Sequence, residues 1–242
     1  MGTIPAVLYH PDELGQHGNF LPASYRRVQQ TPEWTRRLTK VHTSAKRALL
    51  SRDPHRCELD SSNSSDALLM NVFCHPETLA TPATRQLLSV PADATPIFGY
   101  KPRTPLRSSR RDATEIDLKL DSLLIEAKLT EYDFQTAPLR LIQRYRDLEE
   151  VFDPDELDIR DGQVPSYQLI RGVLAAHATP STRFCVLCDA RRPDLIASWY
   201  RLLRAVKLYD LRCRLLVLTW QELAFTLPAP LRLFLDQKYG IA

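Results

Sequence analysis

Glycine is scarce in this 242-residue chain, which holds seven glycines, none of them in a glycine-rich phosphate-binding loop. Dinucleotide-binding and P-loop motifs need closely spaced glycines because the backbone must approach a phosphate. The sequence therefore argues against a nucleotide-dependent enzyme. It also lacks an apolar run near the roughly 18 residues that span a bilayer, and its first residues have no basic segment before an apolar one. We expect a cytoplasmic protein without a membrane partner.

Cysteine is also sparse, and the five cysteines are an odd number, which does not suit a disulfide framework. Cys185 and Cys188 form a CxxC pair inside an apolar segment that predicts a buried strand. Residues three apart on a strand point to opposite faces, and no second cysteine or histidine pair stands at zinc-finger spacing nearby. We therefore expect structural cysteines rather than a metal or redox site.

The charge of the chain is unevenly distributed. The net charge is +3, but residues 112–161 contain 15 acidic and six basic residues, a charge of −9, which leaves +12 for the remainder. The segment 101–111 has no acidic residue and five basic ones: Lys101, Arg103, Arg107, Arg110 and Arg111. Basic segments supply the phosphate contacts of nucleic-acid enzymes, although they are also common on solvated loops. Both interpretations stay open for this segment.

The most informative pattern lies in residues 114–131, where polar and apolar residues alternate as in two β-strands. Asp121-Ser122 fits a two-residue reversal between them, although no glycine strengthens the turn. If the strands pair as a hairpin, Asp117 on the first comes close to Glu126 and Lys128 on the second. Two carboxylates and an ammonium group would then lie together on an otherwise apolar sheet.

Two converging carboxylates are typical ligands of Mg²⁺, which keeps several waters and accepts phosphate oxygens. Such an ion polarises a phosphate and lowers the pKa of a bound water, and a nearby lysine can orient that water or stabilise developing charge. A half-exposed hairpin with ordinary surface charges would show the same alternation. The residues alone leave both interpretations open.

Asp117, followed nine residues later by Glu126-Ala127-Lys128, resembles the active-site signature of the PD-(D/E)xK nuclease superfamily, which has the restriction-endonuclease-like fold. The strings IEAKLTEYDF, FCVLCDARRPDLI and LLVLTWQELA resemble a bacterial family of restriction-endonuclease-like proteins. The resemblance runs from about Ser61 to the C-terminus. It implies a nuclease that uses Mg²⁺ or Mn²⁺, acts on nucleic acid, above all DNA, and is compatible with a homodimer.

The resemblance also implies roles for single residues. Asp117 and Glu126 would hold the metal with the backbone carbonyl of Ala127, and Lys128 would assist the attacking water.

Two further residues follow from the helices on either side of the hairpin. The superfamily often draws another acidic ligand from the preceding helix, which indicates Asp66 or, as the alternative, Glu77. A glutamine on the following helix often reaches the site, which indicates Gln168. Dipole interactions at a helix start and ordinary helix-surface polarity are the competing explanations.

The fold class that we predict is α/β, a restriction-endonuclease-like mixed β-sheet flanked by helices, with an N-terminal helical extension. The extension is placed at residues 1–60 and the nuclease domain at residues 61–242. Besides the hairpin, strands are predicted at 96–100, 182–189 and 212–219. Helices are predicted at 32–50, 66–74, 139–152, 165–178, 191–206, 221–225 and 230–239, with irregular structure at 1–24 and a linker at 76–105.

Two other functions stay open beside the nuclease. One is a non-catalytic nucleic-acid- or partner-binding protein of the same fold, and the other is an α/β domain whose hairpin charges only face solvent. Metal binding separates the first from an enzyme, and convergence of the three hairpin residues separates the second. We expect replacement of Asp117 or Lys128 by alanine to abolish cleavage and leave the fold intact.

Overall fold

The computed structural model describes residues 8–41 and 57–242. The chain divides into two compact units, one formed within residues 1–87 and 224–242 and the other within residues 88–223. The hairpin, the basic segment and Gln168 belong to the second unit, whereas Asp66 belongs to the first. The predicted domain boundary at residues 60 and 61 stays a prediction.

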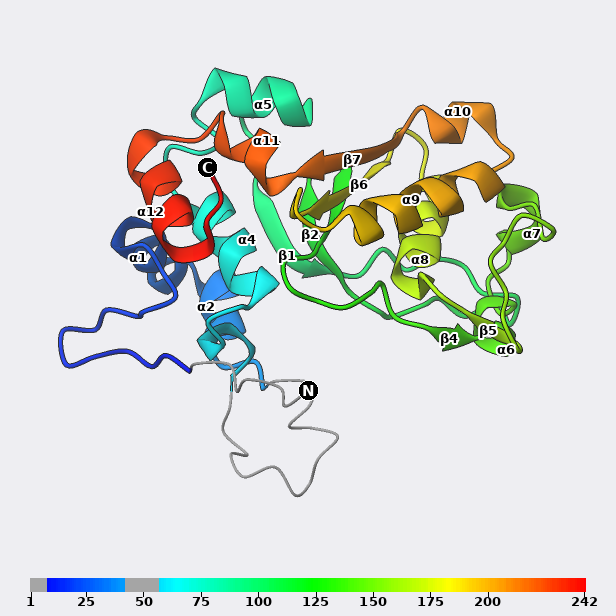
Figure 1. Ribbon diagram of the computed structural model, residues 1–242, viewed down its shortest axis with the longest axis horizontal. Helices are drawn as coiled ribbons and strands as arrows, with labels where there is room; N and C mark the ends of the chain where they lie inside the picture. Colours follow the sequence, from blue (N-terminus) through cyan, green and yellow to red (C-terminus); the bar gives the residue numbers. More distant parts are fainter. Residues whose placement is uncertain (1–7, 42–56) are drawn as a thin grey trace. The chain divides into compact units, whose positions relative to one another are not determined.

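A five-stranded sheet with the order β1-β2-β3-β6-β7 organises the second unit (Figure 1). The strands are β1 (Pro96–Tyr100), β2 (Ile116–Leu120), β3 (Leu123–Ala127), β6 (Arg183–Cys188) and β7 (Leu215–Thr219). The first three pair antiparallel, and β3, β6 and β7 pair parallel. This mixed sheet, flanked by helices, confirms the predicted fold class.

In the hairpin, β2 follows the predicted alternation, whereas all five residues of β3 are buried. The apolar residues of β2 are buried, whereas Asp117 and Lys119 are half-buried. Leu120 pairs with Leu123, which leaves Asp121-Ser122 as the two-residue turn. Asp121 adopts a φ of +50°, a left-handed conformation that aspartate tolerates better than most residues.

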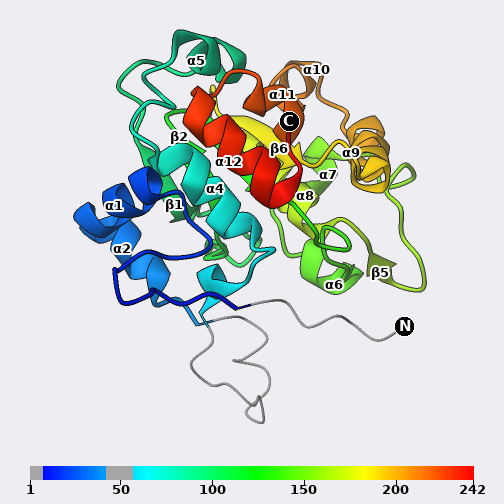
Figure 2. The ribbon, with the colours of Figure 1, turned by 60° about the vertical axis from the view of Figure 1, so that its left-hand side comes forward.

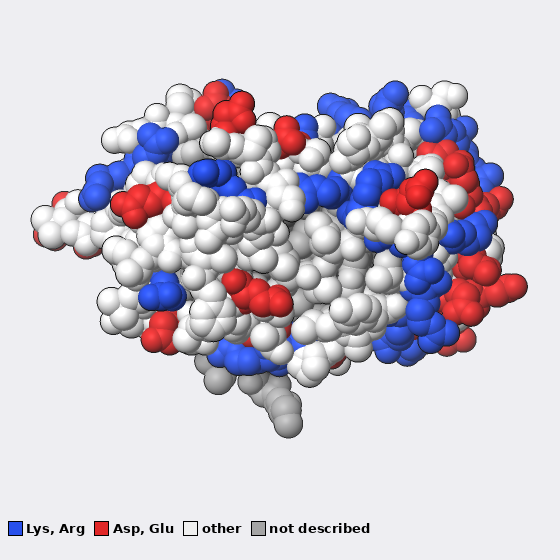
Figure 3. All heavy atoms as spheres, turned by 90° about the horizontal axis from the view of Figure 1, so that it is seen from above, with Lys and Arg blue, Asp and Glu red and all other residues white. Residues whose placement is uncertain are grey.

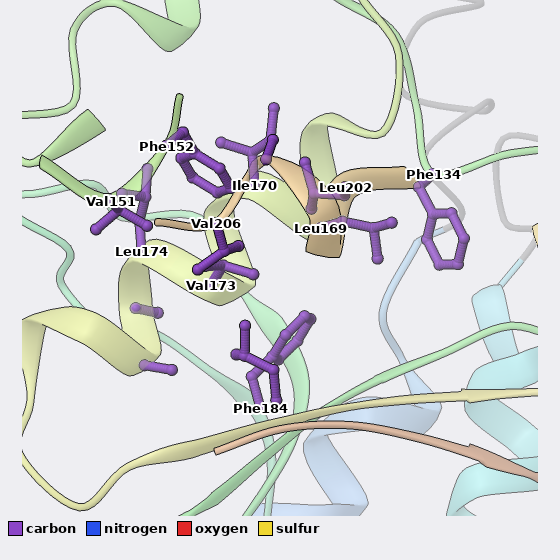
Figure 4. Close-up of a cluster of buried hydrophobic side chains, with 14 of the residues drawn as sticks. Phe134, Val151, Phe152, Leu169, Ile170, Val173, Leu174, Phe184, Leu202 and Val206 are labelled. Carbon is purple, nitrogen blue, oxygen red and sulfur yellow. The ribbon is translucent and has the colours of Figure 1, made fainter. Parts of the chain in front are cut away.

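The helix α8 (Tyr167–Ala178) packs on β3 and β6, and α9 (Pro193–Ala205) packs on β6 and on α8. Their apolar faces and the sheet form the main hydrophobic core of the second unit (Figure 4). At Gly172 of α8, an added Cβ would lie 2.1 Å from the ring of Phe184 on β6. Phe184 is itself fully buried and packs edge-on against Trp199, so helix and strand approach this closely only with glycine at position 172.

The prediction of a single helix at 139–152 is wrong. The chain forms two short helices instead, α6 (Leu139–Ile142) and α7 (Leu148–Val151). Between them, the carbonyl of Arg144 accepts from the amide of Arg107, and the amide of Arg146 donates to the carbonyl of Pro105. These long-range bonds replace helical ones, and no local periodicity reveals them.

Shorter elements complete the second unit. The strands β4 (Ala137–Pro138) and β5 (Gln163–Val164) pair with each other, and α10 (Tyr209–Arg212) precedes β7. The helix α10 lies partly in the segment predicted as a strand, which begins at Leu215 rather than Arg212. Among the residues that the structure describes, no helix is long and apolar enough to cross a membrane.

The first unit groups α1 (Pro22–Gln30), α2 (Pro32–Leu38) and α4 (Ser65–Cys74) together, with the 3-10 helix η1 (Glu58–Asp60) beside α2 and α4 (Figure 2). The helix predicted at 66–74 is confirmed as α4, and the hydroxyl oxygen of Ser64, its N-cap residue, accepts the Ala67 amide at 3.1 Å.

Three predictions for the first unit are wrong or partly wrong. The helix α2 ends at Leu38, and two residues later the carbonyl of Lys40 accepts from the Glu58 amide. Residues 42–50 of the predicted helix lie outside the described residues. The helix α1 begins inside a segment predicted to be irregular, and α5 (Pro82–Leu88) occupies the predicted linker.

The predicted terminal helices are confirmed as α11 (Trp220–Ala224) and α12 (Ala229–Tyr239).

Candidate active site

The three signature residues lie at one end of the β2–β3 hairpin. Leu118 pairs with Ile125, so continuing the antiparallel register by one residue places Asp117 opposite Glu126. Side chains of opposed residues lie on the same face of a sheet, with their Cβ atoms about 5 Å apart. Because β3, β6 and β7 are parallel, this end of the hairpin is also the carboxyl end of the parallel strands, where α/β proteins commonly bind ligands.

Hydrogen bonds hold the cluster together. The backbone amide of Ala127 donates to Oδ2 of Asp117 at 2.8 Å, and Nζ of Lys128 donates to Oε1 of Glu126 at 2.8 Å. The structure therefore brings Asp117, Glu126, Ala127 and Lys128 together as predicted.

The cluster is buried rather than solvated. Glu126 is 1% exposed and Lys128 is 5% exposed. Ordinary surface charges do not sit in such an environment, so the alternative of a solvated hairpin is wrong. Burial also changes the expectation for Lys128→Ala, because a buried charge that loses its partner is costly and the variant will lose stability as well.

The electrostatics of the cluster keep Lys128 charged. Burial alone would lower the pKa of the lysine, but the carboxylates of Glu126, Asp117 and Glu131 raise it above its ordinary value. At neutral pH the side chain is therefore an ammonium group, which donates hydrogen bonds and cannot take up a proton.

Aromatic side chains enclose Lys128, and the sequence analysis missed them. The ring centroid of Phe134 lies 5.8 Å from Nζ, and Nε1 of Trp220 donates to the backbone carbonyl of Lys128 at 2.8 Å. Both residues lie in the sequence strings that resemble the family. That resemblance was the signal by which they could have been identified. Phe134 lies beside the ammonium group, and Trp220 fixes the backbone at the end of β3.

A glycine stands beside Asp117 on the neighbouring strand. Phe98 pairs with Leu118 and Tyr100 pairs with Ile116, so Gly99 faces Asp117 between them. Gly99 has a φ of +63°, a conformation that residues with side chains rarely adopt. No side chain of β1 therefore crowds the Asp117 carboxylate from this position.

The donors of the cluster suit a hard divalent cation. Among residues 8–41 and 57–242, no three His, Cys, Asp or Glu side chains are grouped as metal ligands. Mg²⁺ does not need three, since it is commonly bound by one or two carboxylates and completes its coordination with water and substrate phosphate. Asp117 and Glu126 supply two carboxylates, and the Ala127 carbonyl is a third oxygen donor.

Asp66 has a partner within its own unit. Its Oδ2 accepts from Nη2 of Arg37 at 2.9 Å, and it lies in the first turn of α4. This ion pair and the helix dipole account for an acidic residue at the position. The role of Asp66 as a metal ligand stays a prediction.

Gln168 lies in the first turn of α8, next to the loop that follows the hairpin. Its backbone amide donates to the carbonyl of Phe134 at 3.0 Å. The side-chain atom Oε1 is buried and has no hydrogen-bond partner among the described residues. A buried acceptor without a donor is costly, which fits a group that receives a hydrogen bond from water or substrate, but a catalytic role stays a prediction.

The basic segment lies in the connection from the end of β1 to the start of β2. Asp117 is the second residue of β2, so the segment leaves and returns at the end of these strands that carries Asp117. All five of its basic residues are exposed. Arg107 pairs with Glu149 at 2.9 Å, and Arg111 donates to the carbonyl of Arg103. On the face drawn in Figure 3, basic and acidic side chains lie side by side.

The cysteine pair has no features of a reactive site. Cys185 and Cys188 are buried free thiols. Burial raises the pKa of Cys185 to about 12 and that of Cys188 to about 11, so both remain protonated at neutral pH. This agrees with the structural role expected for them.

A separate pocket of about 140 Å³ adjoins the site but is not part of it. Phe134, Ser166, Arg160 and Arg201 are among its lining residues, whereas the three signature residues are not. Its arginines are engaged locally, Arg160 with Asp158 and Arg201 with the Ser198 hydroxyl. The candidate chemistry lies in the cluster and not in this pocket.

Comparison with known proteins places the whole chain in one family. The family REase-ARP, described as "Restriction Endonuclease associating with ARP", matches residues 5–240. Neither the curated proteins nor the solved structures gave a match. The family description agrees with the mixed sheet and with a substrate that is a nucleic acid. Because the match covers nearly every residue, the chain belongs to the REase-ARP family of restriction-endonuclease-like proteins.

Proposed function

We propose that the protein is a metal-dependent endonuclease that hydrolyses phosphodiester bonds in DNA with Mg²⁺ or Mn²⁺. The observation that carries the proposal is the convergence of half-buried Asp117 with buried Glu126 and Lys128 at the carboxyl ends of parallel strands. Membership of the REase-ARP family supports the nuclease class.

The formal charge of the cluster supports a requirement for a cation. Three carboxylates, those of Asp117, Glu126 and Glu131, act on the ammonium group of Lys128. Glu131 also acts on Arg192, which is itself paired with Asp194. A net negative site would repel a phosphodiester unless a cation is also bound. The carboxylates of Asp117 and Glu126, with the Ala127 carbonyl, would hold that cation. When bound, it polarises the phosphate and lowers the pKa of water.

Lys128 supplies the positive group next to the reacting phosphate. Since its pKa is raised, it acts as a hydrogen-bond donor that orients the attacking water or stabilises charge on a phosphate oxygen. Its bond to Glu126 fixes its position before substrate arrives. Gln168 is the further candidate, with its buried Oε1 able to accept a proton of the water.

The basic segment would bind the phosphate backbone. Lys101, Arg103, Arg107, Arg110 and Arg111 are the residues of this proposed contact surface. Arg107 would exchange Glu149 for a phosphate, and Lys101 lies 3.9 Å from Glu115 in a loose pair. Such contacts give affinity without base specificity.

Cleavage of supercoiled plasmid tests the proposal. The parent should cut with Mg²⁺ or Mn²⁺ and stop with EDTA. Lys119→Ala, which removes a lysine of the same hairpin that faces Tyr100, should cut like the parent. Lys128→Ala should be at least about 100-fold slower. Cutting that persists in EDTA would contradict the metal requirement.

Products and metal binding separate the remaining alternatives. A homodimer that cuts both strands together would give linear plasmid early, whereas a monomer would first give nicked circles. A protein that binds DNA and Mn²⁺ but leaves every substrate intact would be the non-catalytic binding protein. A protein that binds neither would contradict the proposal altogether.

A further inference from the structure

An aromatic ring projects into solvent directly beyond the candidate active site. Tyr132 is 90% exposed, the highest value among the large hydrophobic side chains of the described residues. It stands four residues after Lys128, so the two Cα atoms lie within about 14 Å of each other. A ring this exposed contributes nothing to the core, so its contribution to the fold does not explain it.

The backbone beneath this ring is firmly held. Arg192 donates from Nη1 to the carbonyl of Glu131 at 2.6 Å and from Nη2 to the carbonyl of Tyr132 at 3.0 Å. Arg192 is itself fixed by Asp194, which accepts from Nε at 2.9 Å and from Nη2 at 2.7 Å. Phe134, two residues on, is buried in the core. The loop is therefore ordered, and it presents an aromatic ring outward.

The acidic neighbours of Tyr132 are directed into the loop. Oε2 of Glu131 accepts from the Leu129 amide at 2.6 Å, and Oδ1 of Asp133 accepts from the Gln135 amide at 2.9 Å. Both carboxylates thus bind backbone donors of the loop itself. What the loop offers to a ligand at its tip is a flat apolar ring with a hydroxyl group, which suits a nucleobase better than a phosphate.

We propose that Tyr132 is a substrate-positioning residue that stacks on an unpaired nucleobase beside the scissile phosphate. This inference rests on the proposed nuclease function and specifies the substrate class: single-stranded DNA or DNA with a locally unpaired base. Aromatic side chains of proteins bind single strands by such stacking, without regard to base identity. Bases within an intact duplex are already stacked on each other and would not contact Tyr132 in this way.

Fluorescence of a single-stranded oligonucleotide that carries one 2-aminopurine tests the inference, with Ca²⁺ present in place of Mg²⁺. Stacking should quench the fluorescence with the parent and with Tyr132→Trp. Tyr132→Ala should lose the quenching and bind the single strand about tenfold more weakly, with little change for an intact duplex. Tyr209→Ala is the matched control, because Tyr209 is 77% exposed on α10 at the opposite end of β7, and it should behave like the parent.

The outcomes separate the two proposals. If Tyr132→Ala quenches and binds like the parent, the stacking inference is overturned, while plasmid cleavage continues to test the nuclease. If the parent cuts plasmid but prefers intact duplex to single strands, the inference is again overturned and the nuclease stands. If the parent neither binds nor cuts DNA, both are overturned.

Discussion

At the residue scale, the contact between Glu126 and Lys128 dominates the site. Both side chains are buried and their bond is 2.8 Å long. Removing two charges from water is costly, and their attraction compensates only when the geometry is good. A solvated pair would reach a similar contact without that cost. The protein therefore buries two charges at a cost in desolvation free energy, which is typical of functional sites.

The stability of this pair can be measured directly. Lys128→Met leaves the Glu126 carboxylate buried without its partner and should lower the free energy of unfolding by about 3–5 kcal/mol. The double variant Glu126→Gln/Lys128→Met removes both charges and should recover most of that loss. Urea unfolding followed by circular dichroism measures both. Equal loss in the single and double variants would show that packing, not charge, is responsible.

At the scale of elements, a polar network joins α8 to the start of β2. Tyr145 donates to Oδ2 of Asp112 at 2.7 Å, and Arg171 of α8 donates to the carbonyl of Glu115 at 2.6 Å. Nε of Arg171 lies 3.7 Å from the same Asp112 oxygen. The network fixes the end of the basic loop and the strand that carries Asp117.

The network predicts a pH dependence of stability. Burial tends to raise the pKa of Asp112, but hydrogen bonds from Thr114 and Tyr145 and the charge of Arg171 outweigh it, so the pKa is lowered. A lowered folded-state pKa contributes stability that is complete above about pH 4, the unfolded value, and that is lost as the pH falls through the folded value. Asp112→Asn should therefore be less stable than the parent at pH 7, with a gap that narrows below pH 4. A gap that stays constant from pH 7 to pH 3 in urea unfolding would contradict this.

Packing between α8 and β6 gives a second prediction at this scale. Gly172→Ala places a methyl group against the buried ring of Phe184 and should destabilise the fold by about 1–3 kcal/mol, despite the better helix propensity of alanine. Ala175→Gly in the same helix should cost about 1 kcal/mol through propensity alone, plus the loss of a buried methyl group. Thermal unfolding compares the two, and a stabilised Gly172→Ala would show that the ring can move.

The elements that were predicted from sequence are those with a local signal. Period-two alternation located β2 and β3. The break between α6 and α7 depends on backbone bonds to Pro105 and Arg107, more than 30 residues away, and left no periodic trace. The signature residues followed from a spacing, whereas Phe134 and Trp220 reach Lys128 only through the fold.

At the scale of the whole molecule, the proposed activity depends on attraction to a polyanion by a chain with a net charge of only +3. Acidic and basic side chains lie side by side on the face in Figure 3, and so small a net charge gives only weak general attraction. Local contacts must then supply the affinity. The exposed basic segment, which starts and ends at the edge of the site, is the proposed source.

Salt dependence tests this assignment. The double variant Arg110→Ala/Arg111→Ala should bind duplex DNA more weakly and reduce the slope of log K against log salt concentration by roughly 0.9 for each lost phosphate contact. Arg212→Ala, an exposed arginine on α10, is the control. If the control changes the slope as much as the double variant, the basic segment is not the contact surface.

The central claim is that Asp117, Glu126 and Lys128 form a metal-dependent nuclease site. Asp117 is half-buried, so Asp117→Asn preserves the shape of the side chain and most of its bond to the Ala127 amide while it removes a charge. The most direct measurement is the initial rate of plasmid cleavage in Mn²⁺ by the parent and by Asp117→Asn, after equal urea midpoints show that both are folded. We predict a loss of at least about 100-fold. An equal rate in a folded Asp117→Asn protein would contradict the assignment.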